Sequence, residues 1–427
     1  MVYHAVGHGW TSHALGIDTA GWDIVQDKTE KKLLAQVDGQ RVFFKGIPAN
    51  TNLCYFQEEA RSKFAVTVTE YAKLHPEVDV LHVWLADDCM NFCECDNCKK
   101  KSPSDWYVVL LNSIDDALTQ AGLDTRIAFL AYCELLWPPV HERIINKDRF
   151  LLMFAPITRS YKKTYRQELE QAEFPPVPPY KLNVSNFPRS VAENVAFLRG
   201  WQEVFGGDSF LFDYIMMWEV TRDFSSVYVP QVIFDDSLYL KELGLNGNVS
   251  CQLQRVFFPH GFAMYILGKT LTEGEFDYGA EREKYFSCIY GELAKPVEAL
   301  FETVFKELPV EYFRFEHARV DLALAVRIRK LKAAVIKFEN KYGGHISKDA
   351  IVSKSVEILQ IYTESLKLLC DCLYRKMRGE SFADQKESWL NSCARARCLF
   401  ICSATYAIGL PTWRAFFPMI GSLKASL

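Results

Sequence analysis

Residues 80–88 of the chain read Val-Leu-His-Val-Trp-Leu-Ala-Asp-Asp. Apolar side chains occupy both alternating sets of positions in this run, as in a strand that is covered on both faces of a parallel sheet. The run ends in two adjacent carboxylates, Asp87 and Asp88. In folds built on parallel strands, functional side chains lie at the carboxyl ends of the strands. The stretch therefore predicts a buried strand with the functional site at its carboxyl end.

Similar short runs recur along the first 262 residues and alternate with helical patterns. The predicted strands are residues 3–7, 51–55, 80–86, 126–133, 150–155, 209–215 and 248–253, and the predicted helices between them include residues 57–75, 105–121 and 190–205. Strands that alternate with helices predict an α/β fold with a parallel sheet. We therefore expect a (β/α)8 barrel of the TIM type.

Such a barrel needs eight strands over about 250 residues. Only six or seven predicted strands precede residue 262, and the first begins almost at Met1. We therefore expect the first one or two barrel strands to be missing from this chain.

The pattern changes after the last predicted strand. Apolar residues at spacings of three and four, with charges between them, predict amphipathic helices at residues 282–305, 311–341, 353–378 and 388–406. We expect two domains, a barrel domain over residues 1–265 and an α-helical region over residues 266–427.

The composition bears on partners and location. The net charge is -4 and the basic residues are scattered, so nucleic-acid binding is not supported. No stretch approaches the ~20 consecutive apolar residues of a membrane span. The residues after Met1 do not form an export signal, and the thirteen cysteines then indicate buried thiols in a reducing compartment. The chain as written is expected in the cytoplasm; a start further upstream would allow a secreted or periplasmic protein.

The carboxylates at two predicted strand ends are the catalytic candidates. Asp87 and Asp88 can reach one site from different angles, one ionised and the other protonated as a general acid. One of them could instead cap the following turn. Glu134, at the end of the next predicted strand, could supply the second carboxyl group of a glycosidase.

Further polar and aromatic residues follow the predicted strands and could bind a sugar through hydrogen bonds or ring stacking. Each of them is also compatible with a purely structural role. The substrate-binding candidates are His8, Trp10, Trp84, Tyr132, Trp137, Arg159, Asp213, Tyr214 and Trp218.

Three cysteines, Cys93, Cys95 and Cys98, lie within six residues. They could bind zinc or form a disulfide beside a free thiol. A closed zinc site needs a fourth ligand, which Cys89, Cys133 or a distant histidine would have to supply.

The string from Trp84 to Cys98, with its carboxylates followed by Cys-x-Cys-x-x-Cys, resembles glycoside hydrolase family 163, first catalogued as domain of unknown function 4838. The segments Gly7-His8-Gly9, Asn52-Leu53-Cys54, Leu130-Ala131-Tyr132 and Pro138-Pro139 fit the same pattern, and the resemblance covers about residues 1–330.

The resemblance implies a barrel enzyme that cleaves N-linked glycans as an endo-β-N-acetylglucosaminidase and requires no cofactor. In a substrate-assisted reaction, Asp87 would polarise the 2-acetamido group and Asp88 would protonate the leaving oxygen. The chain departs from the family's Asn-Asp-Gly at Asp87 and Cys89.

Two other functions remain open. A barrel glycosidase similar to α-glucuronidases would use Arg159 to bind a uronate carboxylate. Alternatively, the chain could be an inactive carbohydrate-binding relative. Each of these functions implies a carbohydrate or glycoprotein partner.

Overall fold

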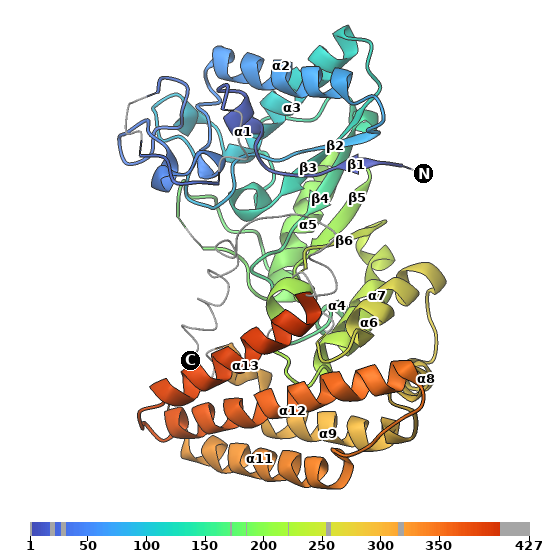
Figure 1. The fold of residues 1–427 in the computed structure, drawn as a ribbon. Coiled ribbons are helices and arrows are strands. Elements are labelled where there is room, and N and C mark those ends of the chain that lie inside the picture. The colour runs from blue at the N-terminus through green and yellow to red at the C-terminus, as the bar shows by residue number, and fades with distance from the viewer. Residues whose placement is uncertain are drawn as a thin grey trace. The chain divides into compact units, whose positions relative to one another are not determined.

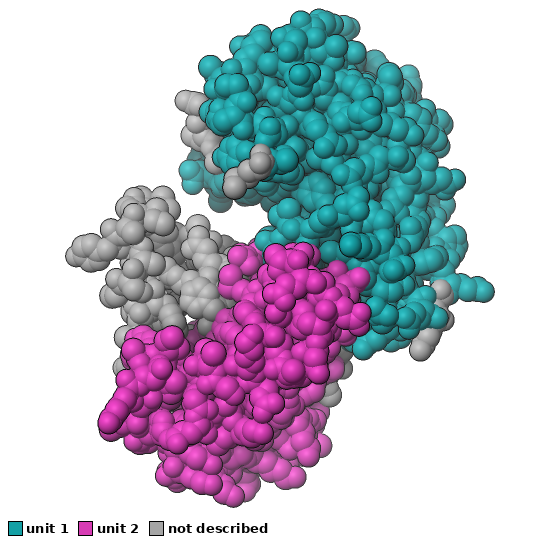
Figure 2. Space-filling model, turned by 90° about the vertical axis from the view of Figure 1, so that its right-hand side faces the viewer, with its two compact units in different colours: residues 1–214, 239–251 teal, residues 215–238, 252–427 magenta. Residues whose placement is uncertain are grey.

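The computed structural model describes most of the chain and divides it into two compact units. The described residues are 2–17, 22–26, 31–170, 173–184, 186–220, 222–252, 258–314 and 320–401, with side chains up to residue 392. The first unit comprises residues 1–214 and 239–251, and the second comprises residues 215–238 and 252–427, as Figure 2 shows in two colours.

A parallel sheet of six strands forms the centre of the first unit (Figure 1). The strands are β1 (His4–Ala5), β2 (Val80–Val83), β3 (Arg126–Ala131), β4 (Phe150–Phe154), β5 (Ser209–Asp213) and β6 (Asn248–Ser250). Each strand pairs with the next one along the chain, and every pairing is parallel. The prediction of a parallel α/β sheet is therefore confirmed.

The sheet is open, because β1 and β6 do not pair with each other. The strand order is that of a (β/α) barrel, but the residues that the structure describes form only part of one. The six-stranded, curled sheet is consistent with the expected barrel that lacks some of its strands, and it is not a full TIM barrel.

One predicted strand, residues 51–55, is wrong. Within it Leu53 forms only an isolated antiparallel bridge with Leu34. The backbone N–H of Cys54 donates to Leu33 O at 2.8 Å, and Ala35 N–H donates to Asn52 O at 2.8 Å. The backbone of this run forms its hydrogen bonds with a neighbouring extended segment and not with the sheet. Its composition is nevertheless similar to that of a sheet strand. Of the predicted strand 248–253, residue 253 lies outside the described part.

Helices cover the sheet, among them those that the sequence predicts at residues 57–75, 105–121 and 190–205. They are α1 (Trp10–His13), α2 (Glu58–Leu74), α3 (Pro103–Gln120), α4 (Tyr165–Leu169) and α5 (Val191–Phe205). The starts of α3 and α5 are fixed by capping boxes, Ser102 with Asp105 and Ser190 with Glu193. Gly206 ends α5 in the left-handed conformation. Helices α2 and α3 pack side by side (Figure 1).

Aromatic side chains between the sheet and α5 form the centre of the core. The ring of Phe129 on β3 lies 5.1 Å from Phe205 and 5.5 Å from Trp201, both on α5. It also lies 6.2 Å from Phe150 on β4. All four side chains are buried, so this cluster joins two strands to the helix that covers them.

The second unit is helical, as the sequence predicts. It contains most of α6 (Tyr228–Tyr239), then α7 (Phe262–Glu273), α8 (Tyr278–Tyr290), α9 (Ala294–Glu307), α10 (Val310–Phe313), α11 (Leu322–Tyr342), α12 (Ala350–Met377) and α13 (Ala383–Ile401). The central helix α12 packs against α8, α11 and α13 (Figure 1). Residues 315–319 and 402–406 of the predicted helices lie outside the described part. In the described residues, no helix is long and apolar enough to cross a membrane.

We expect Phe129→Ala to lower the free energy of unfolding of the first unit by about 3–5 kcal/mol, because it leaves a cavity among buried rings. Phe56→Ala is the matched control, since the Phe56 side chain is exposed and its loss should cost less than about 1 kcal/mol. Urea unfolding of both variants checks the difference. Equal losses would contradict the assignment of the core.

Candidate functional site

The Asp87–Asp88 pair lies at the carboxyl end of β2, in a turn with unusual backbone geometry. Asp88 has a φ of 68° and Met90 a φ of 61°, and on the next strand end Cys133 has a φ of 50°. Left-handed conformations cost side-chain-bearing residues on the order of 1–3 kcal/mol each. The hydrogen bonds around the turn must therefore hold it in place.

Two buried asparagines supply much of that restraint. The side-chain amide of Asn91 donates to the backbone oxygens of Asn50 at 2.7 Å and Asp87 at 2.6 Å. Its oxygen accepts from Asn52 Nδ2 at 2.9 Å. The oxygen of Asn52 accepts in turn from the backbone N–H of Ala86 at 3.3 Å. This network joins the Asp87–Asn91 turn to residues 50–52.

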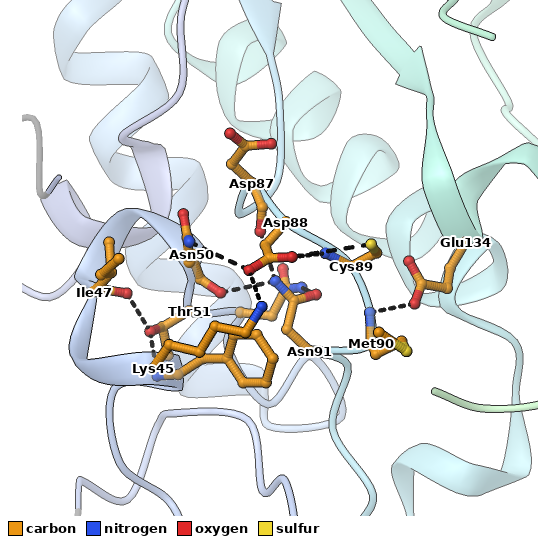
Figure 3. Close-up of polar contacts among 12 residues, drawn as sticks. Lys45, Ile47, Asn50, Thr51, Asp87, Asp88, Cys89, Met90, Asn91 and Glu134 are labelled. Carbon is orange, nitrogen blue, oxygen red and sulfur yellow. Dashed lines mark hydrogen bonds and ion pairs between the residues drawn. The ribbon is translucent and has the colours of Figure 1, made fainter. Parts of the chain in front are cut away.

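Asp88 is held by several donors (Figure 3). Its Oδ2 lies 2.5 Å from Lys45 Nζ and 3.5 Å from Asn50 Nδ2. Its Oδ1 accepts from the backbone N–H of Cys89 at 2.9 Å. Both carboxylate oxygens are thus occupied as acceptors, and the charge of Asp88 has a cation in direct contact. Sequence reasoning did not identify Lys45 or Asn50.

Asp87 points away from Lys45 (Figure 3) and has weaker partners. Its Oδ1 accepts from the Tyr132 hydroxyl at 3.3 Å and lies 3.8 Å from His8 Nε2. Its Oδ2 has no hydrogen-bond partner among the residues that the structure describes. The side chain is 30% exposed, against 22% for Asp88. Asp87 is therefore the carboxylate that is freer to contact another molecule.

His8 is oriented by the backbone that extends β2. Its Nδ1 lies 3.0 Å from Leu85 O, and since a carbonyl only accepts, Nδ1 carries the proton. Nε2 then faces Asp87. The imidazole also packs edge-on against Trp84, with ring centroids 4.9 Å apart.

Glu134 lies behind the turn rather than on its surface. The side chain is 1% exposed, and one oxygen accepts from the backbone N–H of Met90. Its other oxygen, Oε2, is buried without a partner in the described residues. Burial raises the pKa of the Glu134 carboxyl group, the Met90 N–H opposes this, and the charge of Asp88 adds to it. Glu134 therefore supports the strained Met90 from inside.

Two predicted tryptophans use their indole N–H groups within the fold. Trp10 donates to His82 O at 2.8 Å and packs edge-on against Tyr71. Trp137 is buried and donates to Pro178 O at 2.7 Å. In both residues the indole N–H is therefore bonded within the fold, and substrate contact by either ring stays a prediction.

Two further aromatic candidates are also buried. The ring of Trp84 lies 5.7 Å from that of Phe212, and the ring of Tyr214 lies 5.1 Å from that of Phe212. Both side chains are 7% exposed. Both rings thus pack against Phe212, and Trp84 also packs edge-on against His8. Trp218 belongs to the second unit, in the π-helical turn Ile215–Glu219.

Arg159 and Asp213 form a second buried group. The guanidinium of Arg159 lies 4.7 Å from the Tyr161 ring centre and 3.8 Å from that of Tyr165. Asp213 accepts from the Tyr161 hydroxyl at 2.6 Å and from Tyr214 N–H at 2.8 Å. Arg159 is 4% exposed, so it lends no support to recognition of a uronate.

Four cysteines form a cluster, and three of them follow the Asp turn closely in sequence. The sulfurs of Cys54, Cys93, Cys95 and Cys98 all lie within 4.8 Å of one another. All four are free thiols and not disulfides. The three predicted residues thus meet, but the fourth member is Cys54 and neither Cys89 nor Cys133. Such a set could hold a metal ion.

Residues 33–178 match the family model described as "Domain of unknown function (DUF4838)". The matched segment includes Lys45, Cys54, Asp87, Asp88 and Glu134. It confirms that part of the expected resemblance, while membership of glycoside hydrolase family 163 stays a prediction. The curated proteins contain no match.

Among solved structures, the chain is similar to a "GH138 enzyme targeting pectin rhamnogalacturonan II". The two are 12% identical with a TM-score of 0.45, and the similarity covers 80% of this chain. The chain spans 56% of the length of that enzyme.

We expect Asn91→Ala to lower the free energy of unfolding by about 3 kcal/mol, because it leaves buried partners of the amide unsatisfied. Asn97→Ala is the control, since the Asn97 side chain accepts a bond from Lys100 at the surface. Chemical denaturation measures both losses. A loss below about 1 kcal/mol for Asn91→Ala would contradict its role as the restraint on the turn.

Glu134→Gln should change the pH dependence of stability. Because burial raises the pKa of Glu134, the folded wild type keeps a proton that the unfolded chain has lost. Its stability relative to the variant therefore falls as the pH rises above the ordinary glutamate value and levels off once the pH passes the raised pKa. Urea unfolding between acidic and neutral pH checks this. Parallel curves for the wild type and the variant would refute it.

Proposed function

We propose that this chain hydrolyses glycosidic bonds in glycans that contain N-acetylglucosamine, with Asp87 and Asp88 as the two working carboxylates. The observation that carries the proposal is their placement. Both follow β2, both are partly exposed, and each has its own partners. Most glycosidases use a pair of acidic groups at the bond that is cleaved, and substrate-assisted families are exceptions in which the substrate supplies the nucleophile. The third carboxyl group, Glu134, is buried and serves as a positioning residue.

The contacts of Asp88 suit an acceptor that stays ionised through the reaction. Lys45 and the Cys89 N–H already donate to its two oxygens. A general acid must instead carry a proton on an oxygen that faces the leaving group. Asp88 is therefore assigned to accept a hydrogen bond from the substrate's 2-acetamido N–H, which orients the acetamide oxygen toward the anomeric carbon.

The contacts of Asp87 suit the proton donor. Its Oδ2 is available to the leaving oxygen, while Tyr132 and His8 lie beside Oδ1. In the first step the acetamide oxygen attacks the anomeric carbon as Asp87 protonates the leaving oxygen. In the second, Asp87 takes a proton from the water that opens the resulting oxazolinium ion. The contacts thus favour exchanging the two roles that the family resemblance implies.

The test is release of glycan from an N-glycosylated protein, followed by mass spectrometry, and kinetics on aryl β-chitobiosides. Asp87→Asn and Asp88→Asn should each lower kcat/KM by at least ~100-fold on a substrate with a poor leaving group. A dinitrophenyl leaving group needs no proton, so it should restore Asp87→Asn by about 10-fold or more and leave Asp88→Asn impaired. Asp116→Asn, at an exposed position on α3, is the matched control.

Two results would count against the proposal. Absence of release by the folded parent would refute the hydrolase function on these glycans. Rescue of Asp88→Asn in place of Asp87→Asn would return the acid role to Asp88 and overturn the assignment made from the contacts.

A further inference from the structure

The four-cysteine cluster has the spacing of a tetrahedral metal site. Cys54 Sγ lies 3.8 Å from Cys95 Sγ and 3.7 Å from Cys98 Sγ. Zinc–sulfur bonds of about 2.3 Å place tetrahedral ligands about 3.8 Å apart. Bonded sulfurs in a disulfide would instead be separated by about 2.05 Å. The sulfurs are thus already arranged as ligands around one centre.

The surroundings of the cluster suit thiolate ligands. The backbone N–H of Gln36 donates to Cys93 Sγ at 3.3 Å. The guanidinium of Arg41 lies 3.9 Å from the same sulfur. Donors of this kind orient the ligands and offset the negative charge that four thiolates leave around a divalent ion. A backbone donor and a cationic side chain thus lie beside Cys93.

The cluster is closed to substrate. Cys54, Cys93 and Cys98 are buried, Cys95 is half-buried, and Ala35 and Val37 pack against them. A catalytic zinc keeps one position open for water, whereas a structural zinc is enclosed by four protein ligands. Four sulfurs without an open position therefore indicate a structural role.

The cluster joins two parts of the chain that have little other regular structure. Between residues 33 and 57 the backbone forms two 3₁₀ turns, Phe44–Gly46 and Pro48–Asn50, and isolated bridges. This segment carries Lys45 and Asn50, the partners of Asp88. The other three cysteines follow directly on the Asp turn.

We propose that Cys54, Cys93, Cys95 and Cys98 bind one Zn²⁺ ion that fastens residues 33–57 to the segment 87–98. By fixing these two pieces of chain to each other, the ion holds Lys45 against Asp88. It is a structural ion, so it takes no part in bond cleavage. Binding to a preformed set of thiolates also adds its free energy to that of folding.

The first measurement is the metal content of the full chain, purified without added chelator, by mass spectrometry. We expect one zinc ion per chain in the parent and in Cys288→Ser, whose cysteine is exposed and outside the cluster. Cys54→Ser should retain less than about a tenth of that content. Iron in place of zinc, or four free thiols with no metal in the parent, would overturn the proposal.

A second measurement needs no variant and is independent of folding defects in Cys54→Ser. Replacement of the bound ion by Co²⁺ in the parent should give the sulfur-to-cobalt charge-transfer bands and the intense visible bands of a tetrahedral thiolate site. Weak octahedral bands would refute the four-sulfur site. Neither readout depends on glycan hydrolysis. A failure of the zinc proposal can therefore be distinguished from a failure of the proposed function.

Removal of the ion should make one region of the protein vulnerable to proteases. Chelation should open residues 33–57 to limited proteolysis, while α12 in the second unit stays resistant. Mass spectrometry of the fragments locates the cuts. Cleavage spread equally over both units would show that the ion does not act on this segment in particular.

Discussion

The geometry of the carboxylate turn depends on one buried side chain, the amide of Asn91. It contacts the backbone of Asn50 and Asp87 and the side chain of Asn52. These bonds offset the cost of the left-handed backbone at Asp88 and Met90. An amide suits this place because it donates and accepts at once. Hydrogen bonds between uncharged groups therefore position the two carboxylates.

The carboxyl groups at the two strand ends illustrate how surroundings separate roles. Asp87, Asp88 and Glu134 have the same chemistry in isolation. One is half-buried beside His8, one is paired with Lys45, and one is enclosed against Met90. Their differences come from segments far apart in the sequence, which the parallel sheet brings to one edge. The strand ends set the positions of the three carboxyl groups, and residues of the connecting loops are their contact partners.

The sequence predicted the strands and helices that are determined by a local pattern of residues. The strand around residues 80–83 and the helices α3 and α5 follow from apolar runs and capping residues. It misassigned residues 51–55, because pairing partners are not encoded in the composition of one segment. It also missed Lys45 and Cys54, since each acts across a loop with no repeated spacing. Arg159 and Trp137 were chosen by residue type, and residue type alone did not show that both side chains are buried.

The ion pair between Lys45 and Asp88 has one more consequence, for how this protein can change. Lys45 comes from a short turn outside the sheet, and Asp88 follows a strand inside it. A substitution or insertion in the turn can therefore alter the electrostatics of the carboxylate while every strand keeps its register. The carboxylate and the group that tunes it reside on separately replaceable pieces of chain. Selection, or an engineer, can adjust the chemistry without rebuilding the fold.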